Sequence, residues 1–436
     1  MAPRPTVAQE ARALPDTLSL DRAISLALEM NPDLRTSAAQ ADAAGAGQLA
    51  AWGALLPTAS LGLGLNRNDF TRTTFLGEQG TSETLPELLQ SSSQGASQSF
   101  SLNWTAFDLG RIANLRQQSA NVRAAQRRLD DQRVAVVTAA KRAFYEALRR
   151  QRLLELTELQ IQDRQLELDV AQRRYEIAAV ERTDVLQAES NLLNAQITLL
   201  NERREVDNAL RVLSVALGLP PEQAEGTVLR DIDALPEAGE GGREAIVETA
   251  LRSDPELLAY EADRTVASAQ LWGVRSRYIP TITASLNWSR SEQFGPGSSF
   301  FQFSPGDTGR SFSVQASWNL FDGFSREQQT AAAASQRRQA EEGLRGRRLE
   351  IEREMRGFLD QIDQLAQALS LLERSLQIAQ ERLDMTRQMY QLGNAQYTQL
   401  QQAIGDVTLA QSQLIAQRFD YLIAWANLEE YTGVSR

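Results

Sequence analysis

Two long stretches of the chain carry a helical pattern of apolar positions. Residues 87–219 and 306–436 contain no proline, and after Asp108 the helical pattern continues to about Ile177. At ~1.5 Å per residue such a helix is roughly 100 Å long. A helix of that length has to pack against other helices, so we expect coiled-coil packing in a multi-helix wall. The seam predicted for the first helix contains six apolar positions: Ile112, Leu115, Val122, Leu129, Val136 and Ala140.

Four short segments alternate between apolar and polar residues at a period of two. They are residues 59–66, 99–107, 281–289 and 311–321. This alternation predicts strands with one apolar face and one polar or small face. Polar loops separate the strands, so the pattern indicates two hairpins.

The chain contains an internal repeat. The motif Trp-x-x-Phe-Asp, followed by Gly and Arg, appears at 104–111 and again at 318–326. Other matched pairs keep the same order at spacings of 215 or 223 positions: 27–34 with 250–257, 55–66 with 278–289, 175–188 with 390–403, and 209–219 with 424–434. Ordered matches at nearly constant spacing indicate a duplication.

The repeat divides the chain into four parts. We expect an N-terminal extension at 1–17, repeat one at 18–218, a connector rich in Pro, Gly and Glu at 219–242, and repeat two at 243–436. Each repeat contains a helix (18–53, 243–276), a strand pair (near 56–107, 279–321) and long helices (near 108–218, 322–432). The residue before proline avoids the α region, so the first helices should break at Asn31-Pro32 and Asp254-Pro255.

Each long helix should turn back on itself once. The best candidates for the turns are residues 173–189 and 388–404. Thr183 is a candidate N-cap, and Gly393-Asn394 predicts a helix stop in repeat two. Alanines stand at the matching positions in repeat one, so that stop is weaker. A continuous helix through 178–184 is the alternative.

Composition narrows the chemistry. The chain has no Cys and no His, which excludes disulfides, thiolate nucleophiles and His-based proton transfer. A net charge of −11 argues against nucleic-acid binding. Adjacent acids such as Asp130-Asp131 are typical of a solvated helix face. We therefore expect no enzyme activity, no cofactor and no metal site.

The N-terminus and the hydropathy pattern bear on localisation. No uninterrupted run of about 18 apolar residues suggests a transmembrane helix, and the N-terminus has no apolar signal core. Either the protein is cytosolic, or a signal peptide has been removed.

Four strands cannot close a barrel. If their apolar faces meet lipid, other chains must close the edges, and three chains would supply twelve strands. The alternative is a periplasmic or cytosolic coiled-coil scaffold without a pore. In that protein the apolar faces of the strands would point into a soluble core. Trp104, Trp288 and Trp318 fit an aromatic girdle at a membrane interface.

The ordered, duplicated motifs resemble the TolC-like family of outer-membrane efflux proteins. They are Asn/Asp-Pro-x-Leu at 31–34 and 254–257, Leu56-Pro57 and Ile279-Pro280, the two Trp-x-x-Phe-Asp segments, and Tyr-x-x-Gly-x-x-x-x-Thr at 390–398. The terminal Leu-Gly and Thr-Gly at 217–218 and 432–433 complete the set. The resemblance covers residues 16–436.

The resemblance implies a mainly α fold with a small β part. It implies a homotrimer whose twelve-stranded barrel spans the outer membrane and whose α-helical barrel crosses the periplasm. Such a trimer is the exit duct of tripartite efflux or type I secretion. A periplasmic adaptor protein and an inner-membrane transporter are the implied partners, with outer-membrane lipid around the barrel.

The resemblance also implies two sets of functional residues at the turns. The adaptor-docking tip would contain Ala178, Val180, Thr183, Asp184, Gly393, Asn394 and Thr398. The pore constriction would contain Asp184, Gln399 and Gln402. Related channels often have acidic rings at the two glutamine positions, so this chain departs from the family pattern there.

Overall fold

The computed structural model describes residues 17–76, 85–178, 180–232, 235–236, 242–294 and 307–432. The chain divides into two compact units. A helical unit comprises Met1–Asp42, Ala124–Ala262 and Glu342–Arg436, and a sheet unit comprises Ala43–Arg123 and Asp263–Glu341. Each unit therefore draws on both sequence repeats, which is the arrangement expected when neither repeat folds alone.

The first helix of each repeat breaks where proline predicts. Repeat one has α1 (Leu20–Met30) and α2 (Pro32–Gly53), and repeat two has α5 (Arg243–Ser253) and α6 (Pro255–Ser276). The residue at each break satisfies the start of the next helix. Asn31 Oδ1 accepts the Leu34 N–H at 3.3 Å, and an Asp254 carboxylate oxygen accepts the Leu257 N–H at 2.6 Å.

Four long helices follow the strands. They are α3 (Leu109–Glu176), α4 (Arg182–Ala216), α7 (Ser325–Gln391) and α8 (Tyr397–Thr432). In the connector, the short helix η1 (Pro221–Ala224) precedes strand β4 (Val228–Leu229), which pairs in parallel with β1 (Thr17–Leu18). Over the described part of the chain, every helix is either too short or too polar to cross a membrane.

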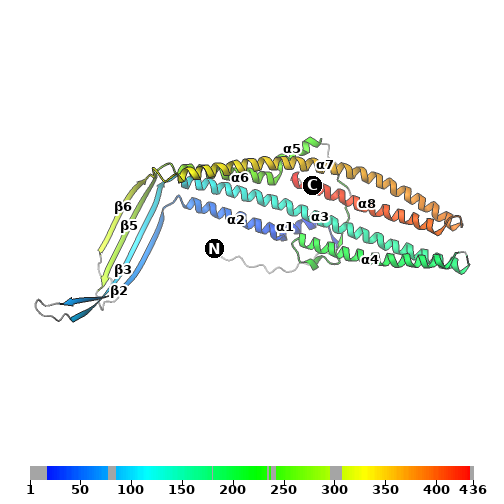
Figure 1. Cartoon of the computed structure of the whole chain (residues 1–436), viewed down its shortest axis with the longest axis horizontal. Helices are drawn as coiled ribbons and strands as arrows, with labels where there is room; N and C mark the ends of the chain where they lie inside the picture. The colour runs from blue at the N-terminus through cyan, green and yellow to red at the C-terminus, as the bar shows by residue number, and fades with distance from the viewer. Residues whose placement is uncertain are drawn as a thin grey trace. The chain divides into compact units, whose positions relative to one another are not determined.

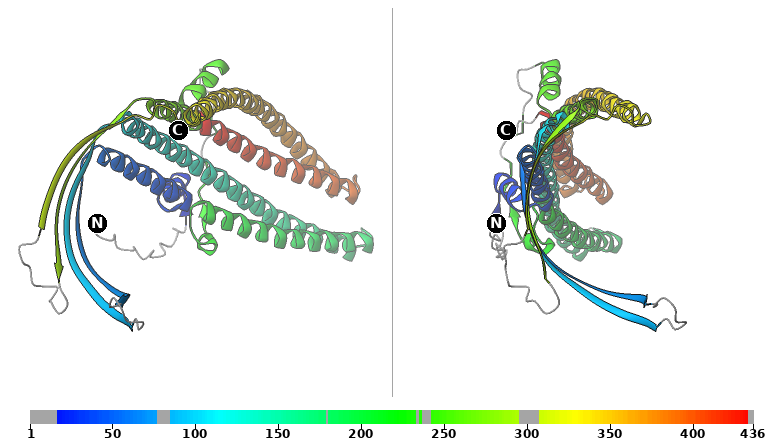
Figure 2. Two further views of the ribbon diagram at one scale, coloured as in Figure 1. Left: turned by 60° about the vertical axis from the view of Figure 1, so that its left-hand side comes forward. Right: turned by 90° about the vertical axis from the view of Figure 1, so that its left-hand side faces the viewer.

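Within the helical unit the four long helices lie side by side in the order α4, α3, α8, α7 (Figures 1 and 2). Ion pairs join the neighbouring helices, among them Arg203–Glu158 at 3.3 Å, Arg149–Asp420 at 3.1 Å and Arg382–Asp406 at 2.6 Å. The main apolar core gathers where α1, α3, α4 and α8 meet, around the fully buried Phe144 and Leu213. Helices α4 and α7 are therefore the outer helices of this row.

The seam predicted at the start of α3 is wrong in its register. Ile112 is exposed, whereas Ala113, Ala120 and Ala124 are each only 1% exposed. A Cβ placed on Gly273 of α6 would lie 3.2 Å from the Ala113 Cβ, so these helices approach closely through small residues. Alanine faces allow closer packing than the larger apolar side chains that the heptad reading favoured. Further along α3, Val136 and Ala140 are buried, as the seam predicted.

The sheet unit contains one antiparallel sheet of four strands. They are β2 (Thr58–Leu76), β3 (Leu85–Phe107), β5 (Thr281–Phe294) and β6 (Asp307–Ser317), in the order β2-β3-β5-β6. Figure 2 shows that the sheet is strongly curved. Strand β6 ends at Ser317, so the prediction that it extends to Phe321 and includes Trp318 is wrong. In the described residues β2 and β6 are the two edges of this sheet.

The two faces of the sheet differ in chemistry, as the alternation predicts. On one face Leu61, Phe100 and Trp288 occupy one row of paired positions. Leu61 and Phe312 on that face are each 71% exposed. On the other face serine hydroxyls pair across strands, Ser60 with Ser101 at 2.6 Å and Ser285 with Ser313 at 2.7 Å. A broad apolar face that its own chain leaves uncovered marks a surface for another apolar phase or partner.

Candidate functional site

The two helical turns are built on the same backbone conformation. Ala178 has φ 57° and Gly393 has φ 77°, and these residues match one another in the sequence repeat. The Ala178 N–H bonds to the Tyr175 carbonyl at 2.9 Å, and the Gly393 N–H bonds to the Tyr390 carbonyl at 3.1 Å. Both are helix ends with a left-handed residue. The alternative of a continuous helix through 178–184 is therefore wrong.

The N-cap of α4 is Glu181, so the prediction of Thr183 is wrong. Glu181 has an extended backbone (φ −83°, ψ 157°), which is the conformation that an N-cap needs. Thr183 lies inside the first turn, and its hydroxyl donates to a Glu181 carboxylate oxygen at 3.3 Å. The left-handed conformation of Ala178 determines where α4 begins. The N-cap therefore lies two residues before the predicted Thr183.

At the start of α8, one of the predicted constriction residues has a structural partner. Gln399 Oε1 accepts the N–H of Gln396, the residue before the helix, at 3.1 Å. This is the backward arm of a capping box. Gln402, one turn further along α8, is exposed and is free of such a contact among the hydrogen bonds of the described residues.

The residues predicted for the docking tip lie on the two turns. Both turns are at the same end of the helical unit (Figures 1 and 2). Five of the seven are exposed and two are half-buried, Val180 and Asp184; the exposed ones are Ala178, Thr183, Gly393, Asn394 and Thr398. The structure thus groups these residues, although grouping alone assigns them no role.

Aromatic and cationic side chains join the two turns. The Arg174 guanidinium lies 4.5 Å from the centre of the Tyr390 ring and donates to the Tyr390 carbonyl at 3.3 Å. The Tyr390 and Tyr397 rings are 6.0 Å apart. Sequence reasoning missed this contact, because Arg174 and Tyr390 are far apart in the chain and neither forms a local motif.

A polar network ties three helices together next to the turns. Gln401 of α8 accepts from Arg164 of α3 at 2.6 Å and donates to Glu167 of α3 at 2.7 Å. Asn191 of α4 donates to the same Gln401 at 2.9 Å. Because the partners of Gln401 come from α3 and α4 while Gln401 belongs to α8, a change in the spacing of these three helices has to break these bonds. Sequence reasoning also missed this network.

The sheet meets the helices through a tryptophan contact that occurs in both repeats. Trp104 Nε1 donates to the Leu55 carbonyl at 3.1 Å, and Trp318 Nε1 donates to the Tyr278 carbonyl at 3.2 Å. Each acceptor lies two residues before a proline that precedes the first strand, and the two prolines match one another in the repeat. These two tryptophans therefore fasten the strand ends to the helix ends.

Trp288 occupies a different level. It lies within β5 opposite Phe100, four residues beyond Ala284, the partner of Trp104. At ~3.4 Å per residue, this is roughly 14 Å further along the sheet. Trp288 of the predicted girdle therefore lies further along the sheet than Trp104.

The junction after β6 is more irregular than its counterpart. Gly323 and Phe324 both have positive φ, 70° and 67°. The Phe321 and Phe324 rings pack edge to face with centres 5.5 Å apart, yet both side chains are 69% exposed. Arg326 is buried and pairs with Asp322 at 3.1 Å. A bulky residue in the left-handed region stores strain, so surrounding contacts have to hold it there.

Among the described residues, no group of three or more Asp or Glu side chains is arranged to hold a metal ion. Acidic and basic side chains of the described residues form ion pairs both within one helix, as between Arg150 and Glu146, and between neighbouring helices, as between Arg149 and Asp420.

Comparison with known proteins gives the family. The sequence profile of the outer membrane efflux protein family matches residues 23–219 and 246–434. The chain is 24% identical to the alkaline protease secretion protein AprF of Pseudomonas aeruginosa, over 94% of this chain and 83% of that protein. It is 30% identical to the protein CyaE of Bordetella pertussis, over 74% of this chain and 65% of that protein.

Solved structures show the same fold. The outer membrane channel CmeC of Campylobacter jejuni superposes with a TM-score of 0.78 at 13% identity, over 95% of this chain and 85% of that one. The chain belongs to the outer membrane efflux protein family. It is an outer-membrane channel subunit, the exit duct of a tripartite efflux or secretion system, and the family consists of transport ducts rather than enzymes. The poreless scaffold, by contrast, leaves the four-stranded sheet without a role.

Proposed function

We propose that three copies of this chain close into one duct, with a twelve-stranded barrel in the outer membrane and a helical barrel in the periplasm. The observation that carries the proposal is the open sheet, with its exposed apolar face and its free edges at β2 and β6. A sheet edge presents unpaired N–H and C=O groups, which lipid cannot satisfy. Pairing β6 of one copy with β2 of the next removes every edge.

Apolar stripes on the outer helices support closure of the helical part. On α4, Leu186, Leu193 and Leu200 recur every seven residues and are 53%, 53% and 66% exposed. On α7, Leu371, Ile378 and Met385 do the same and are 71%, 52% and 58% exposed. Heptad spacing of exposed apolar residues is typical of a seam between helices.

The two stripes also match in height above the turns. Leu193 lies eleven residues after the start of α4, and Ile378 lies thirteen residues before the end of α7. At ~1.5 Å per residue, these positions are roughly 17 and 20 Å along their helices. The neighbouring pairs, Leu186 with Met385 and Leu200 with Leu371, keep the same offset. We infer that α4 of one copy packs on α7 of the next.

The turns would be the periplasmic tip that meets a periplasmic adaptor protein. The seven residues of the tip named above are mostly exposed and group at one end of the helical unit. Asp184 and Gln402 would face the narrowest part of the lumen, with Gln399 holding the start of α8. The adaptor in turn connects the duct to an inner-membrane transporter.

The cargo class follows from the relatives. The name of AprF describes secretion of a protease, and a further relative is named for pyoverdine export. We propose that this duct passes polypeptides or small molecules that its partner transporter selects. The serine-rich face of the sheet would line the barrel and present short, uncharged hydroxyl groups to the cargo.

Disulfide crosslinking tests the closure directly. The chain has no native cysteine, so a Leu193→Cys/Ile378→Cys double variant reports only on the designed contact. The proposal predicts crosslinked trimers on non-reducing gels of outer-membrane extracts. The matched control is Leu193→Cys/Leu371→Cys, which misplaces one cysteine by one heptad, about 10 Å. Equal crosslinking of both pairs, or none, would contradict the proposed seam.

A further inference from the structure

A buried carboxyl group lies at the helix break of repeat two. Asp254 separates α5 from α6 and is only 3% exposed. One of its oxygens accepts the Leu257 N–H at 2.6 Å. Leu257 belongs to an apolar cluster with Ile351 and Met355 of α7, both fully buried. The carboxyl therefore borders the packed interface between the junction and α7.

At the equivalent helix break of repeat one, an uncharged side chain caps the following helix. Asn31 matches Asp254 in the repeat and also caps the helix after the break. In addition, Asn31 Nδ2 donates to the Ala216 carbonyl of α4 at 3.3 Å. An amide satisfies this site at any pH, whereas a carboxylate brings a negative charge that burial disfavours.

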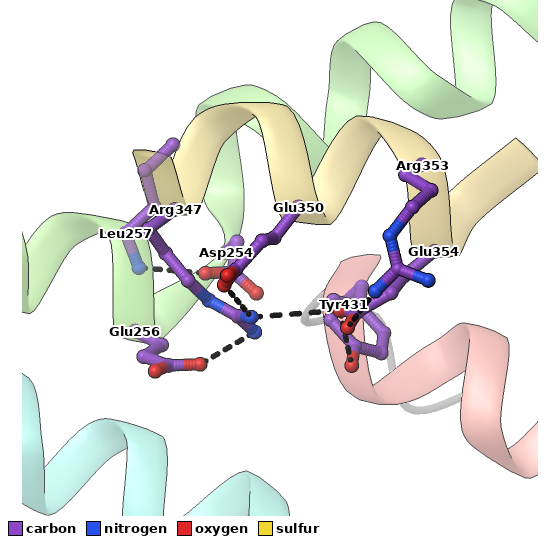
Figure 3. A network of polar contacts seen from close by, with 8 residues as sticks. All are labelled: Asp254, Glu256, Leu257, Arg347, Glu350, Arg353, Glu354 and Tyr431. Atoms are coloured by element: carbon purple, nitrogen blue, oxygen red, sulfur yellow. Dashed lines mark hydrogen bonds and ion pairs between the residues drawn. The ribbon is translucent and has the colours of Figure 1, made fainter. Parts of the chain in front are cut away.

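The neighbouring cation is shared among other acids. Arg347 of α7 forms ion pairs with Glu256 of α6 at 2.6 Å, with Glu350 at 3.2 Å and with Glu354 at 3.5 Å (Figure 3). The Arg347 side chain is only 13% exposed. These three carboxylates thus largely balance the positive charge of Arg347. The guanidinium therefore offsets only part of the negative charge of an ionised Asp254.

More acids face the same region from the other helices. Asp131 of α3 and Glu256 of α6 both act on Asp254 through their charge, and Glu430 of α8 lies near the same two groups. Burial raises the pKa of Asp131 and of Glu430, even though Arg142 pairs with Glu430 at 2.8 Å. Tyr431 of α8 donates to Glu354 at 3.0 Å. Four helices therefore bring acids to one partly buried place.

These surroundings shift the titration of Asp254. Burial raises the pKa of its carboxyl from 3.8 to about 6, and Glu256 and Asp131 add to this effect. The Leu257 N–H and the Arg347 charge oppose it. The group therefore changes its charge within the range of pH that a cell envelope meets.

We propose that Asp254 makes the junction between α5 and α6 a proton-sensitive joint, which packs more firmly on α7 and α8 as its surroundings become acidic. The joint lies within one chain, so the inference stands apart from the proposed trimer and from its partners. The neutral Asn31 leaves the equivalent junction of repeat one indifferent to pH. The two repeats thus differ in their response to protons.

The direction of the effect follows from linkage. A carboxyl whose pKa is higher in the folded state binds more protons there than in the unfolded chain, between about pH 4 and about pH 6. Stability therefore increases as pH falls from about 7 to about 5, and it levels off above the folded-state pKa.

Thermal unfolding of the purified protein in detergent tests the joint. Between about pH 7.5 and about pH 5.5, the wild type should gain a few degrees in melting temperature. At the upper pH the Asp254→Asn variant should melt at a higher temperature than the wild type. Its melting temperature should rise much less on acidification, and the rise that remains should come from Asp131 and Glu430. The control Asp33→Asn removes an exposed acid just after the break of repeat one and should keep the full gain.

The mirror variant provides a second, independent readout. Asn31→Asp places a carboxyl at the equivalent break, so its melting temperature should depend on pH more steeply than that of the wild type. An Asp254→Asn protein that keeps the full response to pH would overturn the proposal. An Asn31→Asp protein with an unchanged response would show that burial at this junction does not create the effect, and would overturn it as well.

Discussion

Ala178 and Gly393 take the same left-handed backbone conformation at equivalent turns of the two repeats, although only one of them is glycine. A left-handed conformation costs an L-residue roughly 1–2 kcal/mol, and glycine avoids this cost. The turn of repeat one therefore carries local strain that the turn of repeat two does not.

Exchanging the two residues separates this strain from other effects. Ala178→Gly should stabilise the fold by about 1 kcal/mol per chain, and Gly393→Ala should destabilise it by a similar amount. Nothing lies within 4 Å of a Cβ added to Gly393, so a steric clash plays no part. The melting temperatures of the two variants should move in opposite directions. A shift of both in the same direction would contradict the inference that Ala178 is strained.

The tryptophan contacts at the sheet junctions should contribute through their indole N–H. Replacing Trp318 by Phe keeps a ring but leaves the Tyr278 carbonyl without its donor, at a cost of about 1 kcal/mol. Trp104→Phe should have a similar effect through Leu55. Trp288→Phe is the control, because the described contacts give its indole no such role. Resistance of the trimer to heating in detergent measures the effect, and equal resistance of all three variants would count against it.

Gln402 should control the charge selectivity of the proposed aperture. Gln402→Glu adds three carboxylates to a trimer and should shift the reversal potential toward cations in a salt gradient. Gln399→Glu keeps an oxygen that can accept the Gln396 N–H, so it should preserve the start of α8 while adding charge. If Gln402→Glu leaves the selectivity unchanged, this residue does not line the narrowest part.

The exposed turns should be necessary for export and dispensable for assembly. Thr398→Glu places a bulky acid on the proposed docking surface, where it has no core contact to disturb. Export by the assembled system should fall at least tenfold, while the amount of trimer in the outer membrane stays the same. Gly393→Glu should do the same with an added loss of stability, because Gly393 has positive φ. Normal export by Thr398→Glu would argue against docking at this surface.

The sequence allowed a good prediction of features that depend on local chemistry. Proline fixed the breaks after Asn31 and Asp254, and Gly393 fixed one helix end. Alternation located all four strands but underestimated β2 and β3, which extend to Leu76 and start at Leu85. In the outer parts of these strands the sequence no longer alternates strictly between apolar and polar residues, so pairing continues beyond the period-two pattern.

Features that depend on distant residues escaped prediction. Glu181 replaced Thr183 as the N-cap because the left-handed Ala178 determines where α4 begins. The contact of Arg174 with Tyr390 and the sharing of Arg347 among three acids join helices from different parts of the chain. Periodicity says which face of a helix is apolar, but it does not say which charged side chain of another helix will meet it.

The claim on which the account depends most is that several copies enclose one continuous water-filled lumen. Purified protein added to a planar lipid bilayer measures this directly as single-channel current. We expect discrete conductance steps from the assembled wild-type protein and none from its monomer. Trimers that insert into the bilayer yet carry no current would contradict the claim.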